Sequence, residues 1–294
     1  MEYEQIYQGN LVEVFKISDS FYFRRANLPI RNQCNGAFIV GNTGVAIVDA
    51  TPGGIEMADE AIKLFHKPVT AIYLTHGHGD HTEGLVDWLD REVTVYCSRR
   101  LVEDLDPSYF KGKLSFVGID GTVKLRLGED VEVELFTNND VAHSKWDTFV
   151  RIPSLGIVCT GDSVVEYQTA YFHSADIHSW INSLRRLANQ KGNYILAGHG
   201  QSLFPYSYIN EFADFLTVVE RCAKDCFKRH WPNPSEVVDE RFTKISWAGV
   251  KELVDRYFAE GNRDTKFLEE KAGPDDARRE VRMNVWAMIR LYIR

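Results

Sequence analysis

The chain has 294 residues, of which 44% are hydrophobic and 26% are charged. This length allows one large domain or one domain with an appendage, and the apolar content excludes disordered and collagen-like chains. The formal charge of −8 disfavours a general nucleic-acid binder, which needs a cationic surface against phosphate. The charge is uneven, because residues 1–220 carry 18 basic and 29 acidic side chains (−11), whereas residues 221–294 carry 16 and 13 (+3).

Strand and helix patterns alternate over the first two hundred residues. The β-rich runs Gly36–Val40 and Val45–Ala50, separated by the turn GNTG, predict a hairpin. Apolar residues at helical spacing predict a helix over Ile55–Phe65, and the continuous apolar run Val69–Thr75 predicts a buried strand. The other predicted elements are a short helix at Leu85–Leu89, strands at Val93–Cys97, Val123–Leu127, Val131–Phe136, Thr148–Ile152 and Gly156–Thr160, a helix at Trp180–Gln190, and a strand at Asn193–Ala197. This order predicts a layered α/β domain over residues 1–205.

The pattern after about residue 205 is helical. Apolar residues at i, i+3 and i+4 predict one amphipathic helix over roughly 208–230, ended by the prolines of WPNPSE. A second helix covers Val250–Tyr257, and a third covers Val281–Tyr292 after a polar stretch that runs to Pro274. We interpret residues 206–294 as a C-terminal helical extension that either caps the active site or forms a homodimer interface.

The N-terminus and the cysteines favour a cytoplasmic protein. The segment MEYEQIYQGN lacks the basic and apolar regions of a secretory signal, and no apolar run reaches the ~20 residues that span a bilayer. Five scattered cysteines do not form a disulfide framework. We therefore expect a chain that associates with neither membranes nor nucleic acid.

The most informative segment is Thr75-His-Gly-His-Gly-Asp-His81, directly after the predicted strand Val69–Thr75. It holds four potential metal ligands, namely His76, His78, Asp80 and His81. The glycines between them let the backbone turn tightly, so the loop could direct the first two side chains at one ion and the last two at another. Imidazole and carboxylate ligands suit zinc, and other divalent transition metals also bind them.

Three further candidate ligands, His143, Asp162 and His199, each follow another predicted strand. Taken singly, they have ordinary interpretations as a loop histidine, a turn aspartate and a histidine at a helix start. Active-site residues on layered α/β folds nevertheless gather on loops at one edge of the strands. Together the seven side chains could form a pair of zinc sites that share one carboxylate.

This ligand pattern resembles that of the metallo-β-lactamase superfamily of zinc hydrolases, over roughly residues 20–205. The resemblance implies an αββα sandwich with two zinc ions at one edge. By analogy, the first ion would be held by His76, His78 and His143. The second would be held by Asp80, His81 and His199, with Asp162 as the bridge. An aspartate bridge without a cysteine ligand is most similar to the glyoxalase-like and lactonase-like members.

The resemblance implies a dinuclear zinc-dependent hydrolase of a small-molecule ester, lactone, thioester or amide, β-lactams included. Zinc lowers the pKa of bound water to about 7, so a metal-bridging hydroxide would attack the carbonyl carbon. Asp80 could orient this nucleophile or pass a proton to the leaving group. Tyr167 and Tyr171 could donate a hydrogen bond to the substrate, although core or rim positions are the commoner explanation. Asp49 would brace the ligand loop, or simply form the turn before Thr51-Pro52-Gly53.

Two other functions remain open at this point. Phosphodiester cleavage would use the same metal site, but the charge of −11 over residues 1–220 argues against it. A non-catalytic ligand-binding protein on the same fold would be expected to have lost ligands, and here all seven are present.

Overall fold

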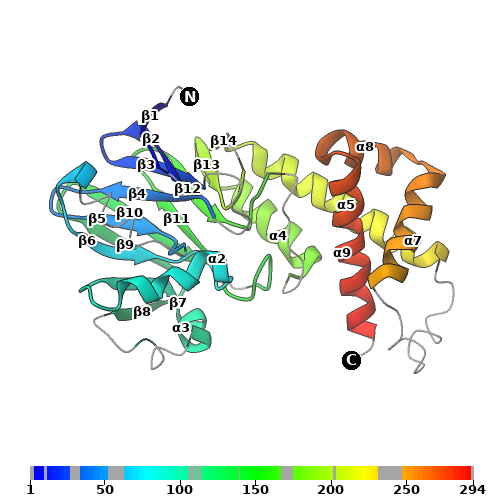
Figure 1. The fold of residues 1–294 in the computed structure, drawn as a ribbon, viewed down its shortest axis with the longest axis horizontal. Coiled ribbons are helices and arrows are strands. Elements are labelled where there is room, and N and C mark those ends of the chain that lie inside the picture. The colour runs from blue at the N-terminus through cyan, green and yellow to red at the C-terminus, as the bar shows by residue number, and fades with distance from the viewer. Residues whose placement is uncertain are drawn as a thin grey trace.

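The computed structural model describes residues 3–9, 12–26, 34–51, 63–105, 110, 114–138, 140–166, 175–200, 203–230 and 247–292. Two β-sheets pack face to face, helices cover their outer faces, and a group of long helices lies at one end of the molecule (Figure 1). The predicted αββα fold class with C-terminal helices is confirmed.

The first sheet has eight strands in sequence order. Its strands are β1 (Glu4–Gln8), β2 (Val12–Ser18), β3 (Phe21–Ala26), β4 (Gly36–Val40), β5 (Val45–Val48), β6 (Val69–Tyr73), β7 (Thr94–Ser98) and β8 (Ser115–Ile119). Strands β1 to β5 pair antiparallel, and β5 to β8 pair parallel. The predicted β4–β5 hairpin is confirmed, with Val40 opposite Val45. Because β5 and β6 are parallel, the residues that follow them emerge at the same edge of the sheet.

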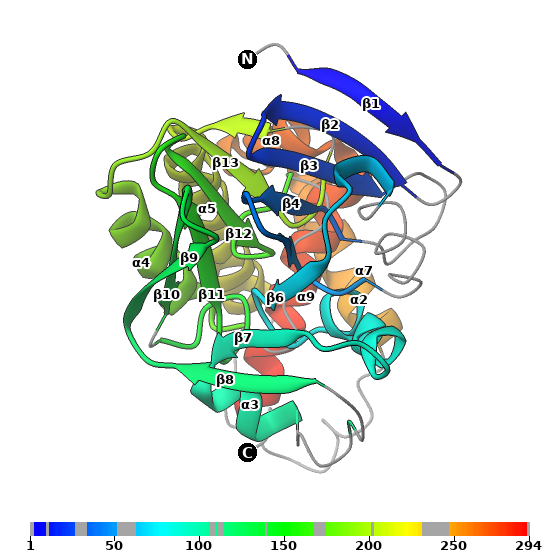
Figure 2. The same cartoon turned by 90° about the vertical axis from the view of Figure 1, so that its left-hand side faces the viewer.

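The second sheet has six strands in the order β14-β13-β12-β11-β10-β9. Its strands are β9 (Thr122–Leu127), β10 (Val131–Thr137), β11 (Thr148–Ile152), β12 (Ile157–Gly161), β13 (Tyr194–Ala197) and β14 (Leu203–Pro205). Strands β12 and β13 are parallel neighbours. Parallel pairing brings the loops after β12 and β13, which carry Asp162 and His199, to the same edge. Figure 2 shows the two sheets one beside the other, with α4 (Ile177–Ala188) outside the second.

Three hydrophobic clusters correspond to the layers. The first lies between the sheets, for example at Phe23, Ile39 and Leu135. The second lies between the eight-stranded sheet and two short helices, η1 (Glu83–Trp88) and α3 (Arg99–Leu105). The third joins the six-stranded sheet to α4 and continues into the C-terminal helices. These are α5 (Tyr208–His230), α7 (Trp247–Glu260), α8 (Arg263–Ala272) and α9 (Pro274–Tyr292). Since one cluster spans both parts, the division at residues 205 and 206 stays a prediction.

Several elements differ from the sequence interpretation. Helix α8 forms within the stretch interpreted as polar linker, because Asn262 and Thr265 make a reciprocal capping box at its start and Leu268 is buried. The predicted helix Ile55–Phe65 lies largely outside the described residues. Strands β1 to β3, β8 and β14 and helix α3 had no predicted counterpart.

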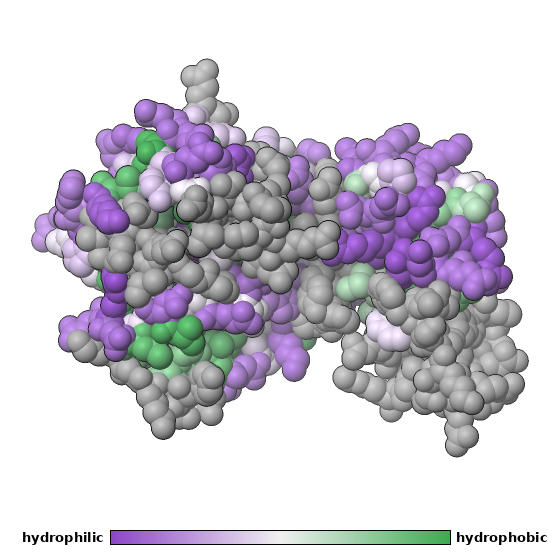
Figure 3. All heavy atoms as spheres, viewed as in Figure 1, coloured by the Kyte–Doolittle hydropathy of each residue, from purple (hydrophilic) through white to green (hydrophobic). Residues whose placement is uncertain are grey.

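The part of the surface coloured in Figure 3 is largely hydrophilic over the C-terminal helices, and a hydrophobic patch lies at the other end of the molecule, on the side of the two sheets. Val86 of η1 is 50% exposed. Within the described ranges, no helix is long and apolar enough to cross a membrane. The cytoplasmic location and the homodimer stay predictions.

Candidate metal centre

The loop that follows β6 carries four of the seven candidate ligands at the edge shared by the two sheets. The backbone N–H of Thr148, at the start of β11, donates to the carbonyl of Thr75 (2.7 Å), which ties the loop to the second sheet. His78 precedes the single-turn helix α2 (Gly79–Thr82), and the hydroxyl of Thr82 donates to its carbonyl (3.0 Å). The chain therefore turns within a few residues, so the side chains of His76 and His78 point to one place and those of Asp80 and His81 to another.

The first candidate group consists of His76, His78, His143 and Asp162. Nδ1 of His78 lies 2.9 Å from Nε2 of His76 and 3.0 Å from Nε2 of His143. Oδ2 of Asp162 lies 3.9 Å from Nε2 of His76 and 3.6 Å from Nε2 of His143. Tetrahedral zinc with bonds of about 2.0–2.1 Å would separate its ligand atoms by roughly 3.3 Å. The spacing of these four side chains therefore fits one ion.

The second candidate group consists of Asp80, His81, His199 and again Asp162. Oδ1 of Asp162 lies 3.2 Å from Nε2 of His81 and 3.3 Å from Nε2 of His199. Oδ2 of Asp80 lies 3.1 Å from Nε2 of His199 and 3.6 Å from Nε2 of His81. The structure thus brings all seven sequence-predicted ligands together, in the two sets that the resemblance implied. Asp162 belongs to both sets and turns one carboxylate oxygen toward each.

Unsatisfied buried atoms favour a cation at the centre. Nε2 of His81 and Oδ1 of Asp162 are buried and lie 3.2 Å apart, but neither makes a hydrogen bond of acceptable geometry with any of the described residues. Buried polar atoms without partners are costly, so native proteins usually pair them with protein groups, water or ions. A divalent ion between these atoms would satisfy both, and the mixed imidazole and carboxylate set suits zinc.

The two groups differ in the protonation of their histidines in the metal-free chain. Burial lowers the pKa of His143 to about 3, and burial together with the charge of His81 holds the pKa of His76 well below its usual value. Burial also lowers the pKa of His199, but the Asp162 and Asp80 carboxylates outweigh it and raise that pKa to about 10. The histidines of the first group are therefore neutral and can bind metal directly. In the second group, the proton on His199 occupies a position where a cation would bind.

The carboxylate of Asp49 supports the ligand loop through hydrogen bonds. Its Oδ2 lies 2.8 Å from Nδ1 of His81, and its Oδ1 accepts the backbone N–H of Thr75 (2.7 Å). The Thr75 hydroxyl lies 2.9 Å from Oδ2 of Asp49 and 3.1 Å from Nδ1 of His76. A proton on Nδ1 of both histidines leaves both Nε2 atoms free to bind metal, which is how outer carboxylates fix ligand tautomers. Asp49 directly follows β5 with a φ of 61° and contacts the ligand loop, so its predicted bracing role fits this geometry, whereas Pro52 and Gly53 of the predicted turn lie outside the described residues.

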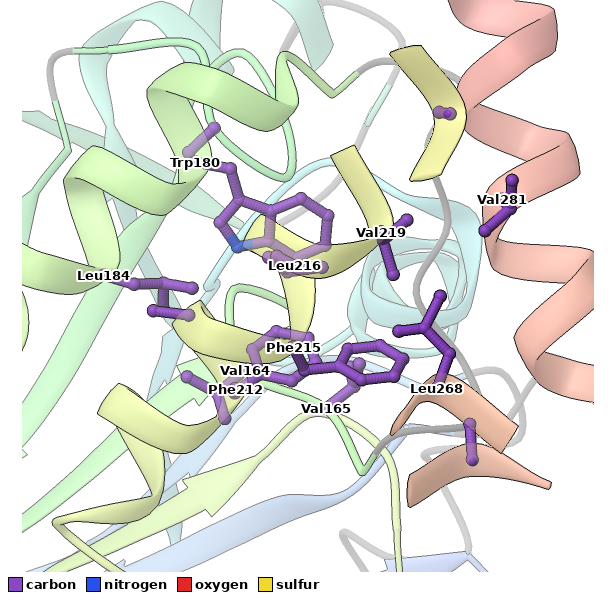
Figure 4. Packing of buried hydrophobic residues seen from close by; sticks show 14 of the residues in the cluster. Val164, Val165, Trp180, Leu184, Phe212, Phe215, Leu216, Val219, Leu268 and Val281 are labelled. Atoms are coloured by element: carbon purple, nitrogen blue, oxygen red, sulfur yellow. The ribbon is translucent and has the colours of Figure 1, made fainter. Parts of the chain in front are cut away.

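Trp180 of α4 supports the other side of the centre. Its ring lies edge-on to the His143 ring with centroids 5.0 Å apart, and its Nε1–H donates to the carbonyl of Ser163 (2.8 Å), the residue after Asp162. Figure 4 shows Trp180 over Leu216 of α5, so this support is itself packed against the C-terminal helices. The sequence analysis placed Trp180 at the start of a predicted helix but did not indicate its polar partner.

Arg24 of β3 is a second support that the sequence analysis missed. Its guanidinium is 1% exposed and donates to the carbonyl of Asp49 (2.8 Å) and to the hydroxyl of Thr51 (2.8 Å). These bonds hold the backbone on which Asp49 adopts its left-handed conformation. A charge inside the apolar segment FYFRRA was the available sequence signal.

The two candidate groups differ in their exposure to solvent, and the predicted substrate-binding tyrosines lie outside the described structure. The side chains of Asp80 and His199 are 16% and 20% exposed, whereas His76 and His143 are each 1% exposed, so the second group faces solvent more than the first. Tyr167 and Tyr171 lie outside the described residues.

Comparison with known proteins gives a family match. Residues 29–199 match the family model described as the Metallo-beta-lactamase superfamily. Solved structures share the fold at low identity. A metallo-beta-lactamase from Pontibacter korlensis is 20% identical with a TM-score of 0.62, over 70% of this chain and 99% of that chain. A metallo-beta-lactamase from Erythrobacter litoralis is 16% identical with a TM-score of 0.57, over 72% and 98%. The DIM-1 metallo-beta-lactamase, in a crystal structure described as exposed to ceftazidime, is 16% identical with a TM-score of 0.60, over 72% and 99%.

Proposed function

The chain belongs to the metallo-beta-lactamase superfamily, whose members are mostly metal-dependent hydrolases, and we propose that it is a hydrolase that uses two divalent metal ions. The observation that carries this proposal is the position of Asp162, whose Oδ2 faces the first group and whose Oδ1 faces the second. Zinc is the proposed metal, because the ligand set contains only imidazole and carboxylate groups at suitable spacing.

The first ion would be held by His76, His78, His143 and Asp162, and the second by Asp80, His81, His199 and Asp162. Bound zinc would supply a Lewis acid for a carbonyl oxygen and would lower the pKa of bound water to about 7. The protein's own part is to keep the ligands in place. Asp49 fixes His81 directly and His76 through Thr75.

Asp80 is the carboxylate that we assign to proton transfer. Of the two carboxylates in the centre it is the more exposed, at 16% against 5% for Asp162, so a substrate can approach it. Burial raises the pKa of Asp80, but the hydrogen bond from His199 and the charge of His81 outweigh it, and the net pKa lies below its usual value. The side chain is therefore ionised at neutral pH, and the carboxylate oxygen that is not turned toward the second ion can accept a proton before passing it to a leaving group.

The proposed substrate is a small molecule with an ester, lactone, thioester or amide bond. These bonds share a carbonyl carbon that water can attack when the carbonyl oxygen is polarised. The acidic character of residues 1–220, with a net charge of 18 − 29 = −11, disfavours a nucleic-acid phosphodiester, which a cationic surface would have to hold.

Metal analysis and a substrate screen test the proposal. Protein purified without added metal should contain close to two transition-metal ions per chain. In a panel of acyl-homoserine lactones, glutathione thioesters, β-lactams and phosphodiesters, at least one carbonyl substrate should be hydrolysed. Asp162→Ala should remove this hydrolysis, whereas Asp176→Ala, which removes only the capping carboxylate of α4, should retain it. Full activity in Asp162→Ala would refute the proposed function.

A further inference from the structure

We propose that Asn35, together with Cys34 beside it, is a positioning residue that holds the second ion's ligands Asp80 and His199 in place. Neither residue belongs to the two ligand groups of the proposed centre, and Cys34 forms a separate candidate group with Asp49 and His81. The assignment rests on the proposed two-ion function and concerns how this chain builds the more exposed half of its centre.

Asn35 binds the backbone on both sides of His199. Its backbone N–H donates to the carbonyl of Gly198 (2.6 Å), and its side-chain Nδ2 donates to the carbonyls of Ala197 (3.3 Å) and Gly200 (3.1 Å). Asn35 is only 6% exposed, and its side-chain bond to the Ala197 carbonyl is buried, whereas the bond to the Gly200 carbonyl is partly buried. Three hydrogen bonds from one residue therefore surround the single turn that directs the His199 imidazole.

Cys34 makes the corresponding contact to the other ligand loop. Its Sγ is buried and lies 3.3 Å from the carbonyl oxygen of Asp80, to which the thiol can donate. The same sulfur lies 3.1 Å from the hydroxyl of Thr51, which Arg24 also contacts. Two adjacent residues thus contact the backbone of two ligands that are far apart in the sequence.

These contacts join the two halves of the sandwich at the metal centre. Residues 34 and 35 directly precede β4 of the eight-stranded sheet, whereas His199 follows β13 of the six-stranded sheet. Other backbone hydrogen bonds of the His199 turn among the described residues lie on its own sheet side, from Gly198 N–H to the carbonyls of Gly161 (2.9 Å) and Val164 (3.2 Å) and from Glu166 N–H to the His199 carbonyl (3.3 Å). Asn35 therefore sets the distance between His199 and Asp80, whose loop belongs to the eight-stranded sheet.

The first ion's ligands have different supports. His76 contacts the Thr75 hydroxyl, and His143 packs against Trp180. Loss of the Asn35 amide should consequently weaken one ion and leave the other nearly unchanged. Removal of a group that orients a ligand typically lowers metal affinity by about 10–100-fold.

Zinc competition against a chromophoric chelator, which resolves two dissociation constants, tests this assignment. Asn35→Ala keeps the backbone bond to Gly198 but removes the two side-chain bonds, and it should weaken one ion by about 10–100-fold. Asn35→Asp places an oxygen against the same two carbonyls and should weaken that ion at least as much. Asn193→Ala is the matched control, because its Nδ2 donates to the Leu155 carbonyl (3.0 Å) at the far end of β13, and both affinities should stay unchanged.

Two further measurements separate positioning from general folding. Urea unfolding of the chelated variants reports fold stability without metal, and the absorption spectrum of the cobalt-loaded protein reports the coordination of each ion. Cys34→Ala should weaken binding of the same ion as Asn35→Ala. If Asn35→Ala does not fold, the Cys34→Ala variant provides the test instead. Unchanged zinc affinities in Asn35→Ala and Cys34→Ala, or equal weakening of both ions, would overturn the positioning role proposed for these residues. Such a result would leave the two-ion function standing. Wild-type protein that binds fewer than two ions would overturn the two-ion function and this assignment with it.

Discussion

Gly198 is the residue at which one added methyl group should disturb both candidate ions. A Cβ at this position would lie 2.0 Å from Oδ1 of Asp162 and 2.7 Å from the backbone carbon of Gly161. Ordinary contacts begin at 3.4 Å, so the carboxylate would have to move by about 3.4 − 2.0 = 1.4 Å. Because Asp162 faces both groups, Gly198→Ala should weaken the binding of both ions.

The size of the effect follows from that displacement. A misplacement of about 1 Å can reduce an enzymatic rate by about 100-fold, so we expect at least this loss in hydrolysis. The crowding against the Gly161 backbone should also lower the free energy of unfolding by about 1–3 kcal/mol, as overpacking does in other cores.

The assay combines metal content, hydrolysis of the best substrate from the screen, and urea unfolding of chelated protein. Gly261→Ala is the matched control. Gly261 has a φ of 61° and no neighbouring atom within 4 Å of an added Cβ, so this variant carries backbone strain of about 1–2 kcal/mol without contact to the centre. Gly261→Ala should keep both ions and full activity. Wild-type metal content and activity in Gly198→Ala would refute the reasoning that Asp162 must occupy its observed position.

Three further predictions follow from single side chains. Asp49→Asn should weaken the second ion by about 10–100-fold in chelator competition, because the amide no longer favours a proton on Nδ1 of His81, and should weaken the first ion less, because Asp49 reaches His76 only through Thr75. Asp176→Asn should weaken neither, and equal affinities in the two variants would contradict this. Trp180→Phe removes the donor to the Ser163 carbonyl and should lower the free energy of unfolding by about 1–3 kcal/mol in urea; an unchanged midpoint would count against the bond. The carboxyl group of Glu280 is buried and has no hydrogen-bond partner within the described ranges of the chain, and burial raises its pKa well above the usual value. The raised pKa keeps its carboxyl protonated in the folded chain at pH values just above the unfolded pKa of about 4.3, so its contribution to stability is fully present below that pKa and falls by up to about 1.4 kcal/mol per pH unit as the pH rises toward the folded pKa. Glu280→Gln should remove this slope at pH values just above the unfolded pKa, and a parallel slope in both proteins would show that another group causes it.

Local patterns in the sequence were enough for the elements that carry the ligands. Strands β6, β10, β12 and β13 were predicted within one or two residues, because each is a continuous or alternating apolar run with a turn signal after it. Helix α5 matched at both ends, since a long amphipathic pattern ends at prolines. Helix α8 was missed, because its stability comes from a cap and from packing of a few buried residues rather than from a regular apolar face.

The sequence by itself determined which residue types are available for metal and where along the chain they lie. The spacing of His76, His78, Asp80 and His81 is local, so one short loop fixes their order and directions. Tertiary structure alone decided how these side chains combine with the distant Asp162, and which of its carboxylate oxygens faces which group.

The supports of the centre also became visible only in the folded chain. Asn35 contacts residues more than 160 positions away, and neither its residue type nor its neighbours in the sequence indicate that partner. Arg24 and Trp180 likewise act through backbone carbonyls, which every residue possesses and which therefore leave no mark in the sequence. The identities of the side chains determine which groups can bind a metal, whereas the distances that bring these groups into one centre depend on how the two sheets pack.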